Sequence, residues 1–81
     1  MNANLVYSRI FGKTFDIRKC VRVINPTQMA FYLKADVVPK DIYVSKNFST
    51  NKDIIVMVFD RDETADLYKQ WETNRKEVAA D

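Results

Sequence analysis

Apolar residues run without a break from Ile54 to Phe59, so an extended segment there is hydrophobic on both faces. Such a run is typical of a strand inside a sheet that is covered on both sides. Residues 41–45 alternate between polar and apolar with the period of two expected for a half-exposed strand. The link 46–52 is polar and turn-rich, which predicts an antiparallel hairpin whose register the long loop leaves open.

Two helices are predicted beside this hairpin. The first starts at an N-cap, Asn25, with Pro26 at its first helical position, and should run to about Asp36. The second starts at Asp60 or Asp62 and has acidic residues in its first turn, where they suit the helix dipole. Its apolar face collects residues at helical spacing: Thr64, Leu67, Tyr68, Trp71 and Val78.

The N-terminal part of the chain allows two interpretations. Residues 20–24 form a strand pattern that leads into the first helix. Residues 5–11 also favour a strand, and Gly12 could turn the chain back into residues 15–17 as a hairpin; the alternative is a loosely ordered arm over residues 1–17. We therefore predict a single small α+β domain over residues 1–81. Its three- or four-stranded, mainly antiparallel sheet has two helices packed on it, in β(β)αββα order.

Composition narrows the chemistry that such a domain can perform. The 81 residues are 47% hydrophobic and 30% charged, as in a folded chain, and they include no histidine, one cysteine and one glycine. The usual general base, a thiolate zinc cluster and a glycine-rich phosphate loop are therefore excluded. No segment approaches the length of a membrane span, so we expect a cytosolic protein with no membrane partner.

The remaining candidates for catalysis have structural interpretations. The acidic group Asp60, Asp62, Glu63 and Asp66 could resemble a divalent-metal site, but helix capping accounts for it better. Cys20 lies in a strand pattern and is interpreted as a small buried hydrophobe, because a catalytic thiol needs a base that this chain lacks. We expect no catalytic residue, no metal site and no cofactor, and we expect that the protein is not an enzyme.

Aromatic residues give the stronger indication of function. If Met29, Ala30, Leu33 and Val37 form the inner face of the first helix, Phe31 and Tyr32 point away from it. Tyr43 could extend their patch, so the predicted partner-binding residues are Phe31, Tyr32 and Tyr43, although Phe31 could instead pack under the N-terminal segment. The doubly apolar strand adds a second surface. Helices on one face would leave Ile55, Met57 and Phe59, or their counterparts, open unless the front hairpin, a second copy or a partner covers them.

The charge of the chain, +2 overall, is unevenly distributed. Its first 24 residues hold five basic side chains against one acidic one. A nucleic-acid surface built from Arg9, Arg18, Lys19 and Arg22 is the alternative that this excess suggests. A solvated strand edge explains the excess more simply, because nucleic-acid modules usually carry more positive charge.

Several segments together resemble small accessory proteins of phages and mobile elements in low-GC Gram-positive bacteria. The resemblance covers roughly residues 21–71 and rests on the segments 25–33, 41–45, 58–64 and 67–71 and on their order. It implies a protein of the bacterial host cytosol that binds a host or defence component, as anti-CRISPR proteins do. Such families often have glycine after the first helix, where this chain has Asp36 and Val37.

The leading hypothesis is a non-enzymatic protein-binding module, encoded by a phage or mobile element, that inhibits a host or defence-system protein sterically. A small nucleic-acid-binding or regulatory protein that uses the basic N-terminal segment is one alternative. A homodimeric structural subunit, which buries its open sheet face against a second copy, is the other.

Overall fold

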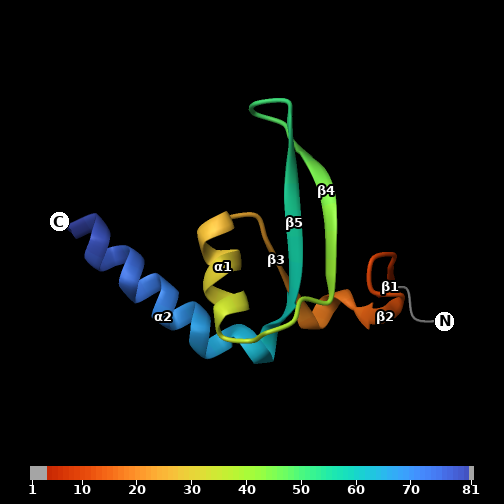
Figure 1. The fold of residues 1–81 in the computed structure, drawn as a ribbon, viewed down its shortest axis with the longest axis horizontal. Coiled ribbons are helices and arrows are strands. Elements are labelled where there is room, and N and C mark those ends of the chain that lie inside the picture. The colour runs from red at the N-terminus through yellow and green to blue at the C-terminus, as the bar shows by residue number, and fades with distance from the viewer. Residues whose placement is uncertain (1–3, 81) are drawn as a thin grey trace.

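The computed structural model describes residues 4–80, and side chains as far as Asn74. Five strands, two α-helices and a short 3-10 helix follow one another along the chain (Figure 1). In order they are β1 (Leu5–Ser8), β2 (Lys13–Asp16), η1 (Ile17–Lys19), β3 (Cys20–Val23), α1 (Pro26–Lys34), β4 (Asp41–Asn47), β5 (Lys52–Asp60) and α2 (Arg61–Ala80). The fold is α+β, as predicted, and the order of helices and strands is roughly the predicted one, with three strands instead of one or two before α1.

The strands form two antiparallel sheets rather than one. Strands β1 and β2 pair with each other, and the main sheet has the order β3-β5-β4. The apolar strand β5 is therefore central, as its hydrophobic pattern predicts. Strands β4 and β5 are longer than expected, because their pairing continues to Asn47 opposite Lys52. Residues 48–51 close the hairpin, and Asn51 takes the left-handed conformation (φ 58°) that asparagine tolerates.

Both helices begin where the sequence predicts. The Asn25 side chain accepts hydrogen bonds from the amides of Thr27 (2.9 Å) and Gln28 (3.3 Å), which makes it the N-cap of α1. Helix α1 ends at Lys34, two residues before the expected Asp36. Asp36 has a φ of 65°, so an aspartate occupies the left-handed position after the helix that glycine usually takes.

Asp60 is the residue that caps α2. Its carboxylate accepts hydrogen bonds from the amides of Asp62 (2.9 Å) and Glu63 (3.1 Å). Thr64 and Trp71 of the predicted apolar face are buried, Leu67 is half-buried and Tyr68 is exposed, while the side chain of Val78 lies outside the described residues. Within the described part of the chain, neither helix is long and apolar enough to cross a membrane.

The front of the chain is a hairpin rather than a loose arm. Gly12, at a φ of 66°, donates its amide to the carbonyl of Ser8 (2.8 Å) and closes the turn between β1 and β2. Residues 1–3 of the predicted arm lie outside the described residues. The hairpin contacts the main sheet through Ser8, whose hydroxyl donates to the carboxylate of Asp41 (2.8 Å).

The hydrophobic core sits at the base of the main sheet, under α1. Val23, Met29, Tyr32 and Phe59 form its buried cluster, and Leu67 of α2 packs against it. The hairpin of β4 and β5 rises past the start of α1 (Figure 1). We call its outer part, residues 44–55, the arm. The long axis of the chain runs from α2 to the front hairpin, and the arm rises across it (Figure 1); the extents are 49 × 31 × 20 Å.

Candidate functional site

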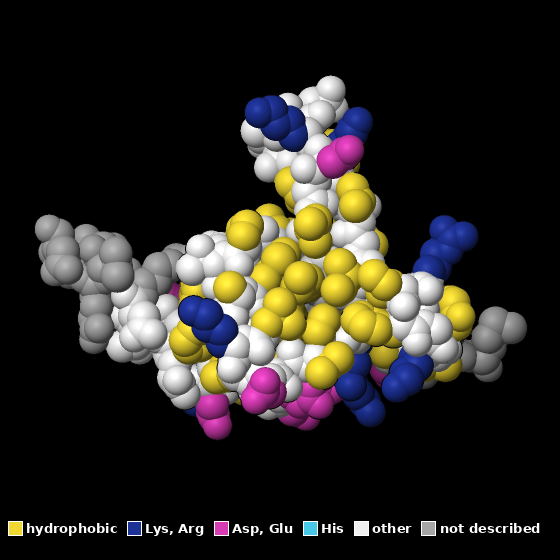
Figure 2. All heavy atoms as spheres, in the orientation of Figure 1, with side chains coloured by type: hydrophobic (Ala, Val, Ile, Leu, Met, Phe, Trp, Pro, Cys, Tyr) yellow, Lys and Arg dark blue, Asp and Glu magenta, His cyan; other side chains and the backbone are white. Residues whose placement is uncertain are grey.

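An exposed apolar surface runs along one face of the β4–β5 hairpin. Ile42 pairs with Met57, and Val44 pairs with Ile55, so each pair projects from the same face. Met57 packs against the core cluster, which identifies this face as the one that carries α1. We call these four residues the apolar strip, and Figure 2 shows apolar side chains gathered over this part of the molecule.

The strip is open at its outer end because α1 is short. Helix α1 has 9 residues, and its buried side chains, Met29 and Tyr32, lie in the cluster with Val23 and Phe59 at the base. Val44 is 66% exposed and Ile55 is 53% exposed, although they are paired apolar neighbours in the sheet. Beyond them, Phe48 in the hairpin turn is 96% exposed. Contiguous apolar exposure of this kind marks contact surfaces more often than isolated apolar residues do.

The opposite face of the hairpin is covered near its base. Val56 and Val58 project to this side and are buried, as is Asp41, the partner of Val58 across the sheet. The buried Ser8–Asp41 hydrogen bond places the β1–β2 hairpin on this same face. The front hairpin therefore covers the side away from α1, and it leaves the apolar strip open.

The three aromatic residues expected to bind a partner do not share a surface. Tyr32 is 1% exposed, and its ring packs edge-on against Phe59 with centroids 5.0 Å apart. Phe31 is half-buried beside the core, with its ring centroid 6.4 Å from that of Tyr32. Tyr43 projects from the other face of the sheet, where its hydroxyl accepts a hydrogen bond from Nε of Arg22 (3.2 Å).

The predicted inner face of α1 is therefore right for Met29, which is buried, and for Val37, which packs against the core, but wrong for Ala30 and Leu33. Leu33, expected inside, is 42% exposed, and Ala30 is exposed as well. Five consecutive apolar residues, 29–33, leave the helix without a clear polar face, so periodicity alone does not fix its rotation. The structure buries the Tyr32 ring in place of the smaller Leu33 side chain. The Tyr32 hydroxyl accepts a hydrogen bond from the Gln28 side chain (2.9 Å), so its polar group keeps a partner.

The basic residues at the front take part in separate contacts. The Arg18 guanidinium pairs with Asp16 at 3.4 Å, and Arg22 donates to Tyr43. Hydrogen bonds from Arg18 lower the pKa of the Asp16 carboxyl below its ordinary value. Arg9 lies in the turn of the front hairpin, whereas Lys19 ends η1 and lines the cleft described next. The structure spreads these four residues over several elements instead of aligning them on one.

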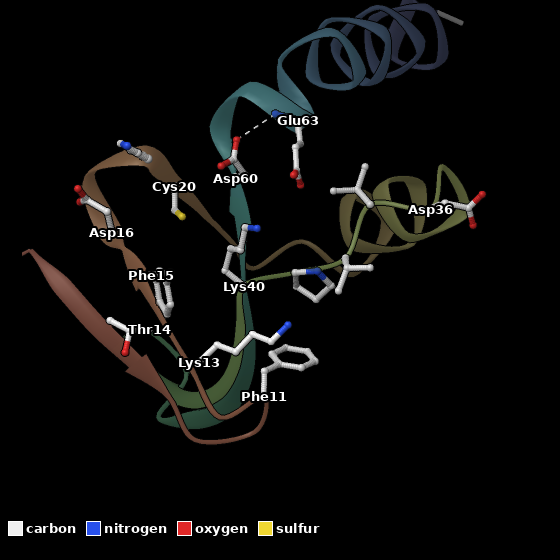
Figure 3. Close-up of a pocket in the computed structure, with 14 residues that line it drawn as sticks. Phe11, Lys13, Thr14, Phe15, Asp16, Cys20, Asp36, Lys40, Asp60 and Glu63 are labelled. Atoms are coloured by element: carbon white, nitrogen blue, oxygen red, sulfur yellow. Dashed lines mark hydrogen bonds between the residues drawn. The ribbon is translucent and has the colours of Figure 1, made fainter.

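A cleft of about 1020 Å³ separates the front hairpin from the α1–β4 connection (Figure 3). Lysines and carboxylates both line it: Lys13, Lys19, Lys40, Asp16, Asp36, Asp60 and Glu63. Two of these carboxylates already have internal roles, since Asp60 caps α2 and Asp16 binds Arg18. The cleft is thus a mixed-charge hollow without a clear preference for a ligand of either sign.

Cys20 lines this cleft but is suited to packing rather than to chemistry. Its side chain is buried, and burial, followed by the negative charge of Asp60, raises the pKa of the thiol above its ordinary value. A raised pKa keeps the sulfur protonated at neutral pH, whereas nucleophilic cysteines need a lowered one. Among the described residues, no group of three acidic or thiol side chains is arranged to hold a metal ion.

The sequence suggested that Ile55, Met57 and Phe59 could be left uncovered on a face without helices. This is right only for Ile55: all three project toward α1, Phe59 is fully buried and Met57 packs against the core. The sequence did not identify Val44 or Ile42 as their neighbours. The register of the hairpin supplies that information, and the long loop had left it open. Comparison of the chain with protein-family models, with curated proteins and with solved structures finds no match. The resemblance to phage accessory proteins therefore stays a prediction.

Proposed function

We propose that this protein is a non-enzymatic binding module that contacts another protein through its apolar strip. The observation that carries the proposal is the pair Val44 and Ile55, which are adjacent in the sheet and both more than half exposed. Burial of such side chains gains about 25 cal/mol for each Å² of apolar surface removed from water. Their position on a projecting arm makes that surface accessible to a partner.

The geometry supports a steric mode of action. The arm is a two-stranded projection, so a partner can lie along the strip without displacing α1 or the front hairpin. The arm's face offers an apolar centre, while Lys46 and its cross-strand partner Asp53 lie on the same face toward the tip. An apolar centre with a charged rim is the usual composition of a protein–protein interface.

The non-enzymatic part of the proposal rests on the chemistry of the side chains. The chain has no histidine, and the pKa of its one thiol is raised rather than lowered. The carboxylates of Asp16 and Asp60 accept hydrogen bonds that stabilise local structure. These features favour a binding role over acid–base or nucleophilic catalysis.

Site-specific photo-crosslinking tests the proposal directly. A benzophenone amino acid in place of Val44 is expected to form a covalent adduct with a protein in the cytosol of a Gram-positive bacterium. That host is chosen because the sequence resemblance predicts a host or defence component as the target. The matched control places the same amino acid at Ser45, which is exposed on the opposite face of β4.

The adduct should form at position 44 and be absent or much weaker at position 45. An adduct at both positions would indicate non-specific contact, and no adduct at either would show that the strip binds no protein under these conditions. Either result would contradict the proposal. Mass spectrometry of the adduct identifies the bound protein and distinguishes a second copy of this chain from a different partner.

A further inference from the structure

Strand β2 has an open edge, because it pairs with β1 on one side only. The amide of Ile17 donates to the carbonyl of Asn4 (2.9 Å), which marks these two residues as a hydrogen-bonded pair of the antiparallel ladder. Hydrogen-bonded and non-hydrogen-bonded pairs alternate, so Phe15 also bonds to β1, while the amides of Thr14 and Asp16 point away from it. Within the described part of the chain, neither of these two amides has a hydrogen-bond acceptor.

The open edge of β2 borders the cleft between the front hairpin and the α1–β4 connection. All four residues of β2 line the cleft, whereas none of the four described residues of β1 does. Figure 3 shows Phe15 and Lys13 on the cleft side of β2, and the apolar residues 37–39 of the connection line the cleft as well. Its volume of about 1020 Å³ is at the upper end of the range of about 300–1,000 Å³ for ligand pockets. The cleft is therefore wide enough to receive a segment of another chain beside β2.

The charges around the cleft are not evenly distributed. Near β2, Lys13 and Lys40 extend into the cleft (Figure 3), and among the described residues neither ammonium group makes a hydrogen bond or an ion pair. The carboxylate of β2, Asp16, is bound by Arg18. The other carboxylates that line the cleft lie where α1 ends and α2 begins. The free charge beside the open edge is therefore positive, although the cleft as a whole carries both signs.

We propose that the cleft binds an extended acidic peptide segment of another protein, which adds a strand to the open edge of β2. An extended backbone offers carbonyls at the spacing of the Thr14 and Asp16 amides, and strand addition is a recurring mode of peptide recognition. Side chains of an added strand point alternately to the two faces of the sheet. On the face that carries Phe15 and Lys13, an apolar side chain contacts the ring, and a carboxylate pairs with Lys13 and Lys40.

Hydrogen exchange of the isotope-labelled full chain, followed by NMR, tests the added strand. The probe is the peptide acetyl-Thr-Val-Thr-Glu-Thr-Val-Thr-amide, whose valines and glutamate share one face when it is extended. Saturation with this peptide should slow the exchange of the Thr14 and Asp16 amides by about tenfold or more. The Phe15 amide is the internal control, because it already bonds to β1 and should change little.

Two altered peptides separate the contributions of backbone and charge. The same peptide with N-methylated amides keeps its side chains but cannot pair with a strand edge, so it should not bind measurably. A peptide with lysine in place of glutamate keeps the backbone but reverses the charge, and its affinity should be lower by about tenfold or more. Fluorescence anisotropy of fluorescein-labelled peptides measures the dissociation constants.

Variants of the chain test the same two contributions. Thr14→Pro removes the free amide without removing a bond to β1, and should weaken binding by about tenfold, the equivalent of one hydrogen bond. Thr14→Ala keeps the amide and is the matched control. Lys13→Glu and Lys40→Glu should each weaken binding by about tenfold or more. Lys34→Glu, in the last turn of α1 and outside the cleft, should leave the affinity unchanged.

Thermal melts show which variants are folded, and if Thr14→Pro does not fold, the lysine variants and the N-methylated peptide decide. The proposal is overturned if the acidic peptide does not bind, if the N-methylated peptide binds equally well, or if exchange of the Thr14 and Asp16 amides is unchanged. Tighter binding of an oligothymidylate than of the peptide also overturns it, because phosphate would then be the preferred ligand.

This inference goes beyond the proposed function, because it concerns a different surface. The cleft shares no residue with the apolar strip. An adduct at position 44 without peptide binding in the cleft leaves the proposed function standing and removes the inference. Peptide binding in the cleft without an adduct at position 44 does the reverse.

Discussion

Phe59 and Ile55 lie on the same strand, project from the same face and are four residues apart, yet one is fully buried and the other is 53% exposed. The difference comes from what lies opposite them. Phe59 contacts the Tyr32 ring of α1, whereas Ile55 belongs to the arm, which α1 does not cover. Hydrophobic patterning therefore specifies which way a side chain points, but not whether anything covers it. A strand with both kinds of position can serve as core at one end and as a contact surface at the other.

The largest expected effect contrasts the two faces of β5. Val56→Asp should unfold the domain, because a buried charge without a partner costs several kcal/mol in a chain with only a few to spare. Ile55→Asp introduces the same charge one residue away, on the open strip, and should change stability by about 0.5 kcal/mol or less. Urea denaturation followed by circular dichroism measures both. Similar losses of unfolding free energy in the two variants would show that the strip is covered, and the two faces of β5 would then not differ.

Helix α1 provides the next test, because it covers the core at the base of the main sheet and leaves the arm uncovered. Tyr32→Ala removes a ring from the core and should lower the unfolding free energy by about 3–5 kcal/mol. Leu33→Ala, at an exposed position on the same helix, should cost less than about 1 kcal/mol. Thermal melting of the two variants shows which substitution lowers stability more. A larger loss from Leu33→Ala than from Tyr32→Ala would instead support the orientation first expected from the sequence, with Leu33 inside.

A smaller effect concerns an exposed contact outside the core. Arg18 lowers the pKa of Asp16 below its ordinary 3.8 through hydrogen bonds to the carboxylate. Because the folded-state pKa is the lower one, this contact stabilises the fold above pH 3.8, and its contribution is lost as the pH falls through the folded-state value. Arg18→Ala removes the guanidinium but keeps the backbone amide of residue 18, so in an NMR titration of the side-chain carboxyl the pKa of Asp16 should rise toward its ordinary value without reaching it. An unchanged titration would show that the pair does not persist in solution.

Much of the fold follows from local signals in the sequence. The central strand is identified by its continuous apolar run. The starts of the two helices are identified by Asn25 and Asp60, and both side chains act as N-caps in the structure. The front hairpin turns at its glycine, Gly12, because the left-handed conformation there suits that residue. These features depend on neighbours a few residues apart, so the sequence displays them directly.

The candidate site was only partly predictable, since it depends on distant contacts. The rotation of α1 is decided by the fit of Tyr32 against Phe59, two residues from separate elements. The buried Ser8–Asp41 bond joins residues 33 positions apart and decides which sheet face the front hairpin covers. The register of the β4–β5 hairpin pairs Val44 with Ile55, and the loop between the strands is too long for the sequence to specify that register. None of these contacts leaves a periodic signal.

The central claim, that the outer part of the apolar strip is open in the single chain and closed by a partner, can be measured by methyl NMR with a soluble paramagnetic probe. At high dilution the methyl signals of Val44 and Ile55 should broaden strongly, while those of the buried Val56 and Val58 should not. When a second copy or a captured partner binds, the Val44 and Ile55 methyls should become protected. Protection already present in the dilute single chain would contradict the account, and so would broadening that persists once the partner is bound.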